Sequence, residues 1–205
     1  MQVYLASTSP ARRQTLTQVG LAPIILSHSV DEEALVAEAT QNGPVPPPEI
    51  VQLLARAKAE DACVPGVTGL VIGGDSVFAV DGDIFGKPHT PENARQRWLR
   101  QRGKTGVLYS GHWVADVKNG VIVAGVGDHT EASVTFRDDI TDDEIDAYIA
   151  TGEPLKVAGA FTIDARGAAF IDRIDGDPYT VVGISVAKIR ELVRRLGYSF
   201  TDLWG

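Results

Sequence analysis

The spacing of apolar residues along the chain predicts a fold that mixes helices and strands. Short, almost uninterrupted apolar runs at residues 3–6 and 67–77 are typical of buried strands. Apolar residues that recur every three or four positions predict helices at residues 49–63 and 186–196. Because the two patterns follow one another along the chain, we expect an α/β protein.

Turn signals within this pattern predict that the sheet is partly antiparallel. Asp81-Gly82 and Asn119-Gly120 each join two apolar segments, as the tight turns of β-hairpins do. Hairpins exclude a purely parallel, doubly wound sheet. Thr141-Asp-Asp-Glu144 has the pattern of a capping box and predicts the start of a short helix that ends at Gly152. Two further strands are expected between this helix and the last one. The glycine-rich motifs of dinucleotide-binding and P-loop proteins do not occur. The prediction is therefore a mixed, partly antiparallel sheet flanked by helices.

Length and composition limit the classes of protein to which the chain can belong. With 205 residues, of which 44% are hydrophobic, it can form a sizeable core in one domain or in two tightly joined lobes. The single cysteine, Cys63, excludes an internal disulfide and a zinc site built from cysteines. A formal net charge of −8 disfavours long nucleic acids as ligands, because Lys and Arg supply most of that affinity. A small polyanion held by a few cations or a metal ion remains a suitable ligand.

The hydropathy of the chain argues against a membrane protein. The N-terminal residues do not resemble a signal peptide, and no apolar run approaches the roughly 20 residues that a membrane-spanning helix needs. We therefore expect a protein without membrane association.

The first candidate site is the polar segment that follows the first predicted strand. It contains Ser7, Ser9, Arg12 and Arg13, and Ser9 followed by proline favours the start of a helix. Backbone N–H groups at a helix start, hydroxyl groups and guanidinium groups together favour the binding of phosphate. The alternative interpretation is a helix cap followed by solvated arginines.

The second candidate site contains Asp75, which follows Gly73-Gly74 within an apolar run. A carboxylate in such a run must be paired, hydrated at the sheet edge or bound to a metal ion, and the glycines leave room for a ligand. The alternative is a turn aspartate at a strand end. A hairpin can return Lys87 to the side of Asp75. Beside a phosphate, Asp75 would hold a metal ion or polarise water, and Lys87 would stabilise the charge on the phosphoryl group.

Two further charged residues are candidates for the same chemistry. Glu32 lies in the acidic run at residues 31–33, and with Asp75 it would provide enough carboxylate ligands for Mg²⁺ or Mn²⁺. Acidic runs are usually solvated, which is the alternative interpretation. Lys58 shares a helix face with the apolar residue Leu54. It either extends along the edge of the core towards water or reaches across it towards an anion.

The order of these segments resembles the signature segments of the Maf family of nucleotide pyrophosphatases. The resemblance extends over roughly residues 3–197 and continues beyond the candidate sites. The matching segments are Leu5-Ala-Ser-Thr-Ser-Pro-Ala-Arg-Arg13, Val30-Asp-Glu32, Ala57-Lys58-Ala59, Gly74-Asp75-Ser-Val77, Gly86-Lys-Pro88, Tyr148-Ile-Ala-Thr-Gly-Glu-Pro154, Ala158-Gly159-Ala-Phe161 and Val182-Gly183-Ile184.

The resemblance implies a single Maf-like domain over residues 1–205, in which two lobes flank a cleft as in Maf and inosine triphosphatase folds. It implies metal-dependent hydrolysis of nucleoside triphosphates, including modified or noncanonical ones, to the monophosphate and pyrophosphate. It also implies a cytoplasmic location, a homodimer in many members, and a link to the arrest of cell division.

The roles that the resemblance implies agree with the chemistry argued from the residues. Ser7, Ser9 and Arg12, with Arg13 beside them, would hold phosphate. Glu32 and Asp75 would bind Mg²⁺ or Mn²⁺, and Asp75 would also activate the attacking water. Lys58 and Lys87 would stabilise the triphosphate.

The positions expected to contact the base depart from one branch of the family. Members that act on thymidine and uridine triphosphates typically carry Asp-Lys before Ala-Gly and a glutamine further along, where this chain has Lys156-Val157 and Asp164. An ionised carboxylate only accepts hydrogen bonds, so Asp164 favours the N–H edge of a guanine-like base.

Two other functions are consistent with the same residues. A nucleotide-binding regulator of cell division would not depend on hydrolysis, and for that function the retention of Asp75, Lys87 and Glu32 is unnecessary. A phosphatase for another phosphorylated metabolite would release inorganic phosphate instead of pyrophosphate.

Overall fold

The computed structural model describes residues 1–205 as two compact units. Unit 1 comprises Met1–Asp75, Ser110–Thr130 and Gly183–Gly205, and unit 2 comprises Ser76–Tyr109 and Glu131–Val182. Three strands contribute residues to both units: β3 (Gly69–Val80), β5 (Thr105–Lys118) and β6 (Val121–Phe136).

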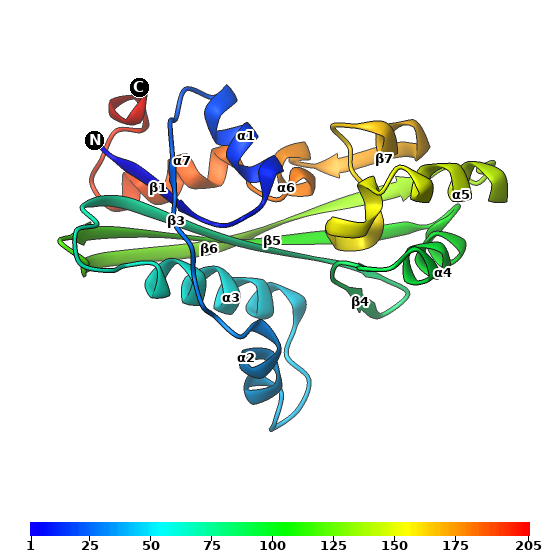
Figure 1. Ribbon diagram of the computed structural model, residues 1–205, viewed down its shortest axis with the longest axis horizontal. Helices are drawn as coiled ribbons and strands as arrows, with labels where there is room; N and C mark the ends of the chain where they lie inside the picture. The colour runs from blue at the N-terminus through cyan, green and yellow to red at the C-terminus, as the bar shows by residue number, and fades with distance from the viewer. The chain divides into compact units, whose positions relative to one another are not determined.

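Unit 1 contains a sheet with helices on both faces (Figure 1). Its strand order is β2-β1-β3-β5-β6, and β1 (Val3–Ala6) pairs in parallel with both β2 (Ile24–Ile25) and β3. Helices α1 and α7 lie on one face, and α3 lies on the other. The helices of this unit are α1 (Pro10–Gln18), α2 (Glu32–Ala39), α3 (Pro47–Asp61), α7 (Val186–Arg195) and the 3-10 helix η4 (Phe200–Leu203).

The starts of these helices follow from capping residues in the sequence. Ser9, Asp31 and Ser185 precede α1, α2 and α7, and each side chain accepts a hydrogen bond from a backbone N–H of the first turn. Proline at the start of α1 and of α3 fits the fixed φ of that ring and removes no intrahelical hydrogen bond. The first helix start, predicted at Ser9-Pro10, is therefore confirmed.

The core of unit 1 has one layer on each face of the sheet, because side chains along a strand alternate in direction. Leu70 and Ile72 of β3 pack in a buried cluster with Leu16 of α1 and Ile189 of α7. Val71 points the other way and packs in a second cluster that contains Ala59 of α3. Asp75 has the same parity as Val71, so its carboxylate is directed to the α3 face.

Helix α3 lies in direct contact with the backbone of β3 at Gly73. A Cβ atom at this position would lie 2.1 Å from the carbonyl oxygen of Ala55 and 2.8 Å from the Cβ of Ala59. Only glycine permits this approach. The approach brings the buried face of α3, including Lys58, against the strand that carries Asp75.

Unit 2 contains the strand order β4-β3-β5-β6-β7. β4 (Asp83–Phe85) pairs antiparallel with β3, with Ala79 opposite Ile84, and β7 (Ile171–Gly176) pairs antiparallel with β6, with Val134 opposite Ile174. The helices of this unit are α4 (Pro91–Gln101), α5 (Asp142–Ala150), α6 (Pro178–Val182) and the 3-10 helices η1 (Glu153–Lys156), η2 (Ala158–Ala160) and η3 (Arg166–Phe170).

Aromatic side chains form the centre of the core of unit 2. Phe78, Phe136 and Phe161 contact one another edge to face, with ring centroids 5.0 to 5.8 Å apart. The indole of Trp98 packs against Phe136, and its Nε1 donates to the carbonyl oxygen of Ala160 at 2.8 Å. This bond satisfies the indole N–H, the only polar atom of a side chain that is fully buried.

The mixed, partly antiparallel sheet is confirmed, and so are the hairpins at Asp81-Gly82 and Asn119-Gly120. The capping box that starts a helix at Thr141 is also present. The prediction of two strands after Gly152 is wrong for one of them, because only β7 forms and residues 153–170 hold η1, η2 and η3. Gly159 and Ala160 adopt φ of 70° and 61°, a left-handed conformation that two consecutive residues of a regular strand do not adopt.

Replacing Gly73 by alanine is expected to destabilise the protein. The added methyl group would overlap a backbone carbonyl of α3, which cannot move away as the end of a flexible side chain can. We expect the free energy of unfolding in urea to fall by at least ~2 kcal/mol, in the range of overpacking substitutions.

Gly86→Ala is the matched control for this substitution. A Cβ at Gly86 meets nothing within 4 Å, and its φ lies outside the left-handed region. The free energy of unfolding of this variant should stay within ~0.5 kcal/mol of the wild-type value. Equal effects of the two substitutions would contradict the close approach at Gly73.

Candidate active site

The junction between β1 and α1 holds three of the residues predicted to bind phosphate. The Oγ of Ser7 accepts hydrogen bonds from the backbone N–H of Ser9 at 3.2 Å and from Nη1 of Arg12 at 3.1 Å. The Oγ of Ser9 accepts the backbone N–H of Arg12 at 3.4 Å, as expected of an N-cap residue. Ser7 is buried, so these bonds fix the junction in one conformation.

Arg12 is held from a distant part of the chain. Its Nε donates to the carbonyl oxygen of Gly183 at 2.8 Å, although the two residues are 171 positions apart. Burial lowers the pKa of the guanidinium, while the negative charges of Asp75 and Glu32 oppose that change. An arginine remains protonated under these conditions, so Arg12 is a fixed cation near two carboxylates.

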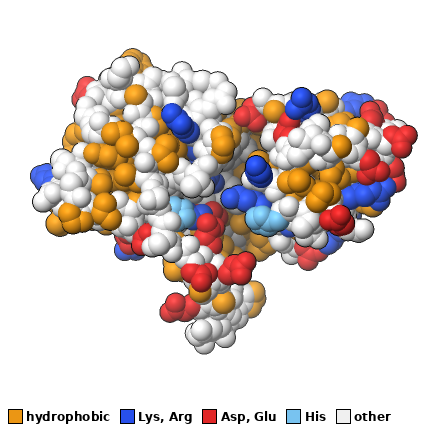
Figure 2. All heavy atoms as spheres, viewed as in Figure 1, with side chains coloured by type: hydrophobic (Ala, Val, Ile, Leu, Met, Phe, Trp, Pro, Cys, Tyr) orange, Lys and Arg blue, Asp and Glu red, His pale blue; other side chains and the backbone are white.

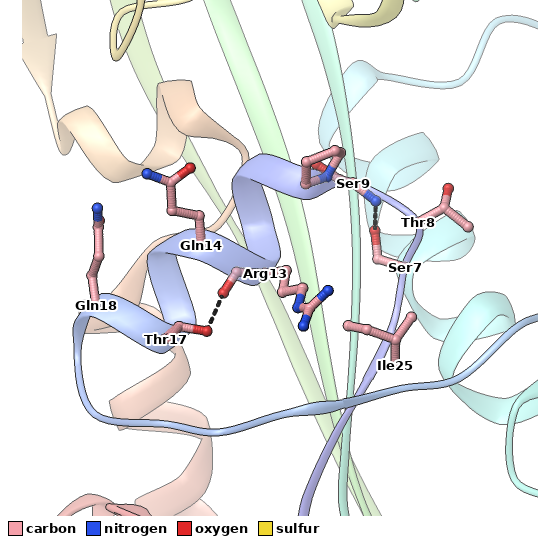
Figure 3. A pocket seen from close by; sticks show the side chains of 9 residues that line it. Ser7, Thr8, Ser9, Arg13, Gln14, Thr17, Gln18 and Ile25 are labelled. Carbon is pink, nitrogen blue, oxygen red and sulfur yellow. Dashed lines mark hydrogen bonds between the residues drawn. The ribbon is translucent and has the colours of Figure 1, made fainter.

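An open hollow of about 760 Å³ lies against the start of α1 (Figure 3). Ser7, Thr8 and Ser9 stand at one end of the view and Gln18 at the other, with Arg13 between them. Arg13 is exposed and lines the hollow, whereas Arg12 is turned to the protein. The hydroxyl groups, the helix start and Arg13 provide donors for an anion.

Lys58 joins the two carboxylates that were predicted to bind a metal ion. Its Nζ lies 2.7 Å from Oδ1 of Asp75 and 2.8 Å from Oε1 of Glu32. Lys58 and Asp75 are 5% and 8% exposed, whereas Glu32 begins α2 and is exposed. Figure 2 shows other acidic side chains gathered over α2. Lys58 therefore pairs with two carboxylates and does not extend along the edge of the core into water. Its role towards a phosphate stays a prediction.

Gly74 brings the phosphate-binding candidates and the carboxylates together. A Cβ at this position would lie 3.3 Å from Nε of Arg12, which is closer than ordinary van der Waals contact. The Arg12 side chain thus lies against β3 at the residue before Asp75. Unit 1 alone collects Ser7, Arg12, Glu32, Lys58 and Asp75 in one place.

The carboxylates of Glu32 and Asp75 fit a divalent cation. Both direct an oxygen at the same ammonium nitrogen, so one cation already lies between them. No group of three or more His, Cys, Asp or Glu side chains is placed to hold a metal ion. Mg²⁺ is usually held by one or two carboxylates together with substrate phosphates and water, which is the set of ligands that this site and a triphosphate would provide.

His28 is a neighbour of this cluster that the sequence did not indicate. It is half-buried, and burial and the positive charge of Lys58 lower its pKa, while Glu32 and Asp61 act in the opposite direction. The buried Nδ1 has no hydrogen-bond partner. No motif spacing marks this histidine, and only its position shortly before residues 31–33 would have suggested it.

His112 supports the strand–helix junction from the interior. It is fully buried, and its Nε2 accepts the backbone N–H of Ser185 at 2.9 Å, two residues after the Gly183 carbonyl that holds Arg12. Burial, followed by the positive charge of Arg12, lowers the pKa of His112 to about 3. The imidazole is therefore neutral at physiological pH.

The remaining predicted residues belong to unit 2. Lys87 follows β4 and is exposed, and Asp164 is exposed in the bend before η3. The bend is held by Glu153, whose Oε1 accepts from Thr162 Oγ1 at 2.7 Å and from the backbone N–H of Gly167 at 3.0 Å. The roles of Lys87 and Asp164 stay predictions.

The chain is similar to known proteins over its whole length. Residues 2–196 match the family described as Maf-like protein. A nucleoside triphosphate pyrophosphatase from Leifsonia xyli subsp. xyli is 55% identical over 100% of this chain and 97% of its own. Proteins of the same name from Streptomyces coelicolor and Corynebacterium jeikeium are 47% and 45% identical, and the alignments cover 99% and 100% of this chain and 94% and 100% of theirs. No helix is long and apolar enough to cross a membrane.

Lys58→Met is expected to destabilise unit 1, because it leaves the buried Asp75 carboxylate without its cation. Removal of one partner of a buried ion pair typically costs about 3 kcal/mol or more. We expect a loss of that size in the free energy of unfolding, measured by urea denaturation at pH 7. The double variant Lys58→Met, Asp75→Asn should recover much of it, and an unchanged value for the single variant would argue against the ion pair.

The neutral state of His112 predicts a dependence of stability on pH. Histidine in an unfolded chain titrates near pH 6.5, whereas His112 in the folded protein stays neutral down to about pH 3. Unfolding therefore takes up a proton in this window, and the free energy of unfolding falls as the pH is lowered through it.

His112→Gln tests this dependence, since its amide oxygen can still accept the N–H of Ser185. Between pH 6 and 4, wild type should lose ~1.4 kcal/mol per pH unit more than the variant. Urea denaturation at several pH values measures the difference. Parallel curves for the two proteins would mean that His112 does not contribute to it.

Proposed function

This chain belongs to the Maf family, and from that premise we propose that it is a nucleoside triphosphate pyrophosphatase that depends on Mg²⁺ or Mn²⁺. The observation that carries the proposal is the meeting of Arg12, Lys58, Asp75 and Glu32 within unit 1. The fixed guanidinium of Arg12 can bind phosphate oxygens. The carboxylates of Asp75 and Glu32, which now share the ammonium group of Lys58, can bind a divalent cation. The names of the relatives support the same activity.

The phosphate chain would bind at the junction of β1 and α1. Ser7 and Ser9 provide hydroxyl groups there, and Arg12 provides a guanidinium whose orientation is set by Gly183. Arg13 lines the adjoining hollow and is free of the bonds that restrain Arg12. Charged donors of this kind recognise phosphate oxygens and bind them more strongly than neutral donors do.

Glu32 and Asp75 would hold the divalent cation together with phosphate oxygens. When bound, it would neutralise charge on the phosphates and polarise the phosphoryl group under attack. Asp75 would take the proton of the attacking water, whose oxygen bonds to phosphorus as the α–β anhydride bond breaks and pyrophosphate leaves. Lys58 and Lys87 would stabilise the negative charge that develops on the phosphates.

The preference for a base is a finer part of the proposal. Asp164 would accept hydrogen bonds from the N–H edge of a guanine-like base, and Glu153 supports this by fixing the bend in which Asp164 lies. We also infer a cytoplasmic enzyme, because its substrates are intracellular metabolites. A homodimer and a role in the arrest of cell division stay predictions.

Asp75→Asn is the substitution that tests the activity. An amide cannot take the proton of water and is a poor ligand for Mg²⁺, so we expect the rate of pyrophosphate release to fall by at least ~100-fold. The measurement is pyrophosphate release from a panel of natural and modified nucleoside triphosphates, with Mg²⁺, with Mn²⁺ and with chelator.

Asp116→Asn is the control, since Asp116 is a half-buried aspartate of unit 1 that bonds to Tyr198 and lies outside the proposed site. It should retain wild-type rates. Activity that survives both chelator and Asp75→Asn would exclude the proposed chemistry, and inorganic phosphate as the first product would indicate a phosphatase. Release from uridine and thymidine triphosphates that clearly exceeds release from every guanine nucleotide would refute the base preference.

A further inference from the structure

The segment that carries Lys87 has no secondary structure of its own. Residues 86–90 connect β4 to α4, and Pro88 has no N–H to donate. Pro88 is buried, whereas Gly86 and Lys87 are exposed. The carbonyl oxygens of Gly86 and Pro88 accept the backbone N–H groups of Gly159 at 3.3 Å and of Thr90 at 2.8 Å. Side chains of α4 provide further donors to this segment.

Two side chains of α4 hold three consecutive carbonyl groups of this segment. Nη1 of Arg97 donates to the oxygen of Gly86 and Nη2 donates to the oxygen of Lys87 at 3.3 Å. Nδ2 of Asn93 donates to the oxygen of Pro88 at 3.1 Å. Asn93 and Arg97 are four residues apart, so they share one face of the helix. The backbone of Lys87 is thus fixed by a two-pronged donor.

The side chain of Lys87 is in the opposite situation. It is exposed and forms no hydrogen bond or ion pair with the chain. The bonds to this residue therefore fix where the side chain begins and leave the ammonium available for a ligand.

Arg97 has no carboxylate partner, which distinguishes it from its neighbour Arg100. Both guanidinium groups lie over the ring of Phe85, at 5.2 and 5.3 Å from its centroid. Arg100 forms an ion pair with Asp83, whereas Arg97 is half-buried and directs its donors only to main-chain carbonyls. Burial also lowers the pKa of Arg97. A half-buried cation without a counter-charge is costly, and the carbonyl oxygens of Gly86 and Lys87 and the ring of Phe85 are the groups that offset this cost.

We propose that Arg97 is a positioning residue that acts through Lys87: its guanidinium bonds to the carbonyl oxygens of Gly86 and Lys87 and thereby sets the place from which the Lys87 ammonium reaches the triphosphate. The inference rests on the proposed function, because it gives Lys87 a substrate. Arg97 itself needs no contact with that substrate.

The first comparison is between Arg97→Met and Arg100→Met. Both variants keep an unbranched stem over Phe85 and lose a guanidinium, but only the first loses the bonds to the Lys87 segment. We expect Arg97→Met to lower kcat for pyrophosphate release from GTP and UTP by ~10- to 100-fold, the range for a displaced catalytic group. KM should change little, since Lys87 is assigned to charge that develops during the reaction. Arg100→Met should keep wild-type kcat.

A double-mutant cycle separates positioning from a general structural effect. In a Lys87→Met background, Arg97→Met should cause no further loss of kcat, because the group that it positions is already absent. Arg97→Lys keeps the charge without the two-pronged geometry, and we expect it to recover less than half of the lost rate. Melting temperatures of Arg97→Met and Arg100→Met should agree.

Several results would overturn the inference while leaving the proposed function intact. One is an equal loss of kcat from Arg97→Met in the wild-type and in the Lys87→Met background. Another is a wild-type kcat for Arg97→Lys. The third is a wild-type kcat for Arg97→Met when Lys87→Met has lost activity. If wild type releases pyrophosphate from no nucleotide, or Lys87→Met is fully active, the role of Lys87 in the proposed function fails, and the inference fails with it.

Discussion

The ammonium group of Lys58 between the carboxylates of Asp75 and Glu32 is the interaction on which the candidate site depends. A buried carboxylate in the middle of an apolar strand is unfavourable unless a cation accompanies it. Lys58 provides that cation from α3, and the same contact connects α2 to the sheet through Glu32. The chain therefore contains its own counter-ion where the proposed reaction needs a metal ion. Binding of that ion would have to redistribute the bonds of Lys58, which would free its ammonium for phosphate.

Two adjacent glycines make this arrangement possible, and each serves a different face of β3. Gly73 lets the backbone of α3 approach, so that a lysine can reach the strand with its stem still in the core. Gly74 leaves space for the Arg12 side chain. Because successive residues of a strand face opposite sides, the pair admits a helix on one side and a guanidinium on the other. Lys58 of α3 thus bonds to the carboxylate of Asp75, while the side chain of Arg12 lies against the strand at the preceding residue.

Local sequence signals were sufficient for most of the architecture. The hairpin at Asn119-Gly120 and the helix start at Ser9 depend on neighbouring residues, and both are where they were predicted. Helical spacing also showed that Lys58 lies on a buried face. It did not show which anion Lys58 meets, because Asp75 is 17 positions away and on another element. His112 and Arg97 escaped prediction for the same reason, since their partners are backbone groups that only the folded chain brings near. The strand expected after Gly152 failed because the left-handed residue Ala160 carries no marker in the sequence.

The way in which the two units divide the chain has a consequence for how this molecule can be taken apart. Unit 1 is assembled from three separate stretches of sequence and unit 2 from two, and β3, β5 and β6 each pass from one unit to the other. No contiguous part of the sequence contains all of one unit without part of the other, so neither unit can be transferred to another protein as a contiguous domain. The chain forms two compact units, but only the whole chain is a contiguous stretch of sequence in which both units are complete.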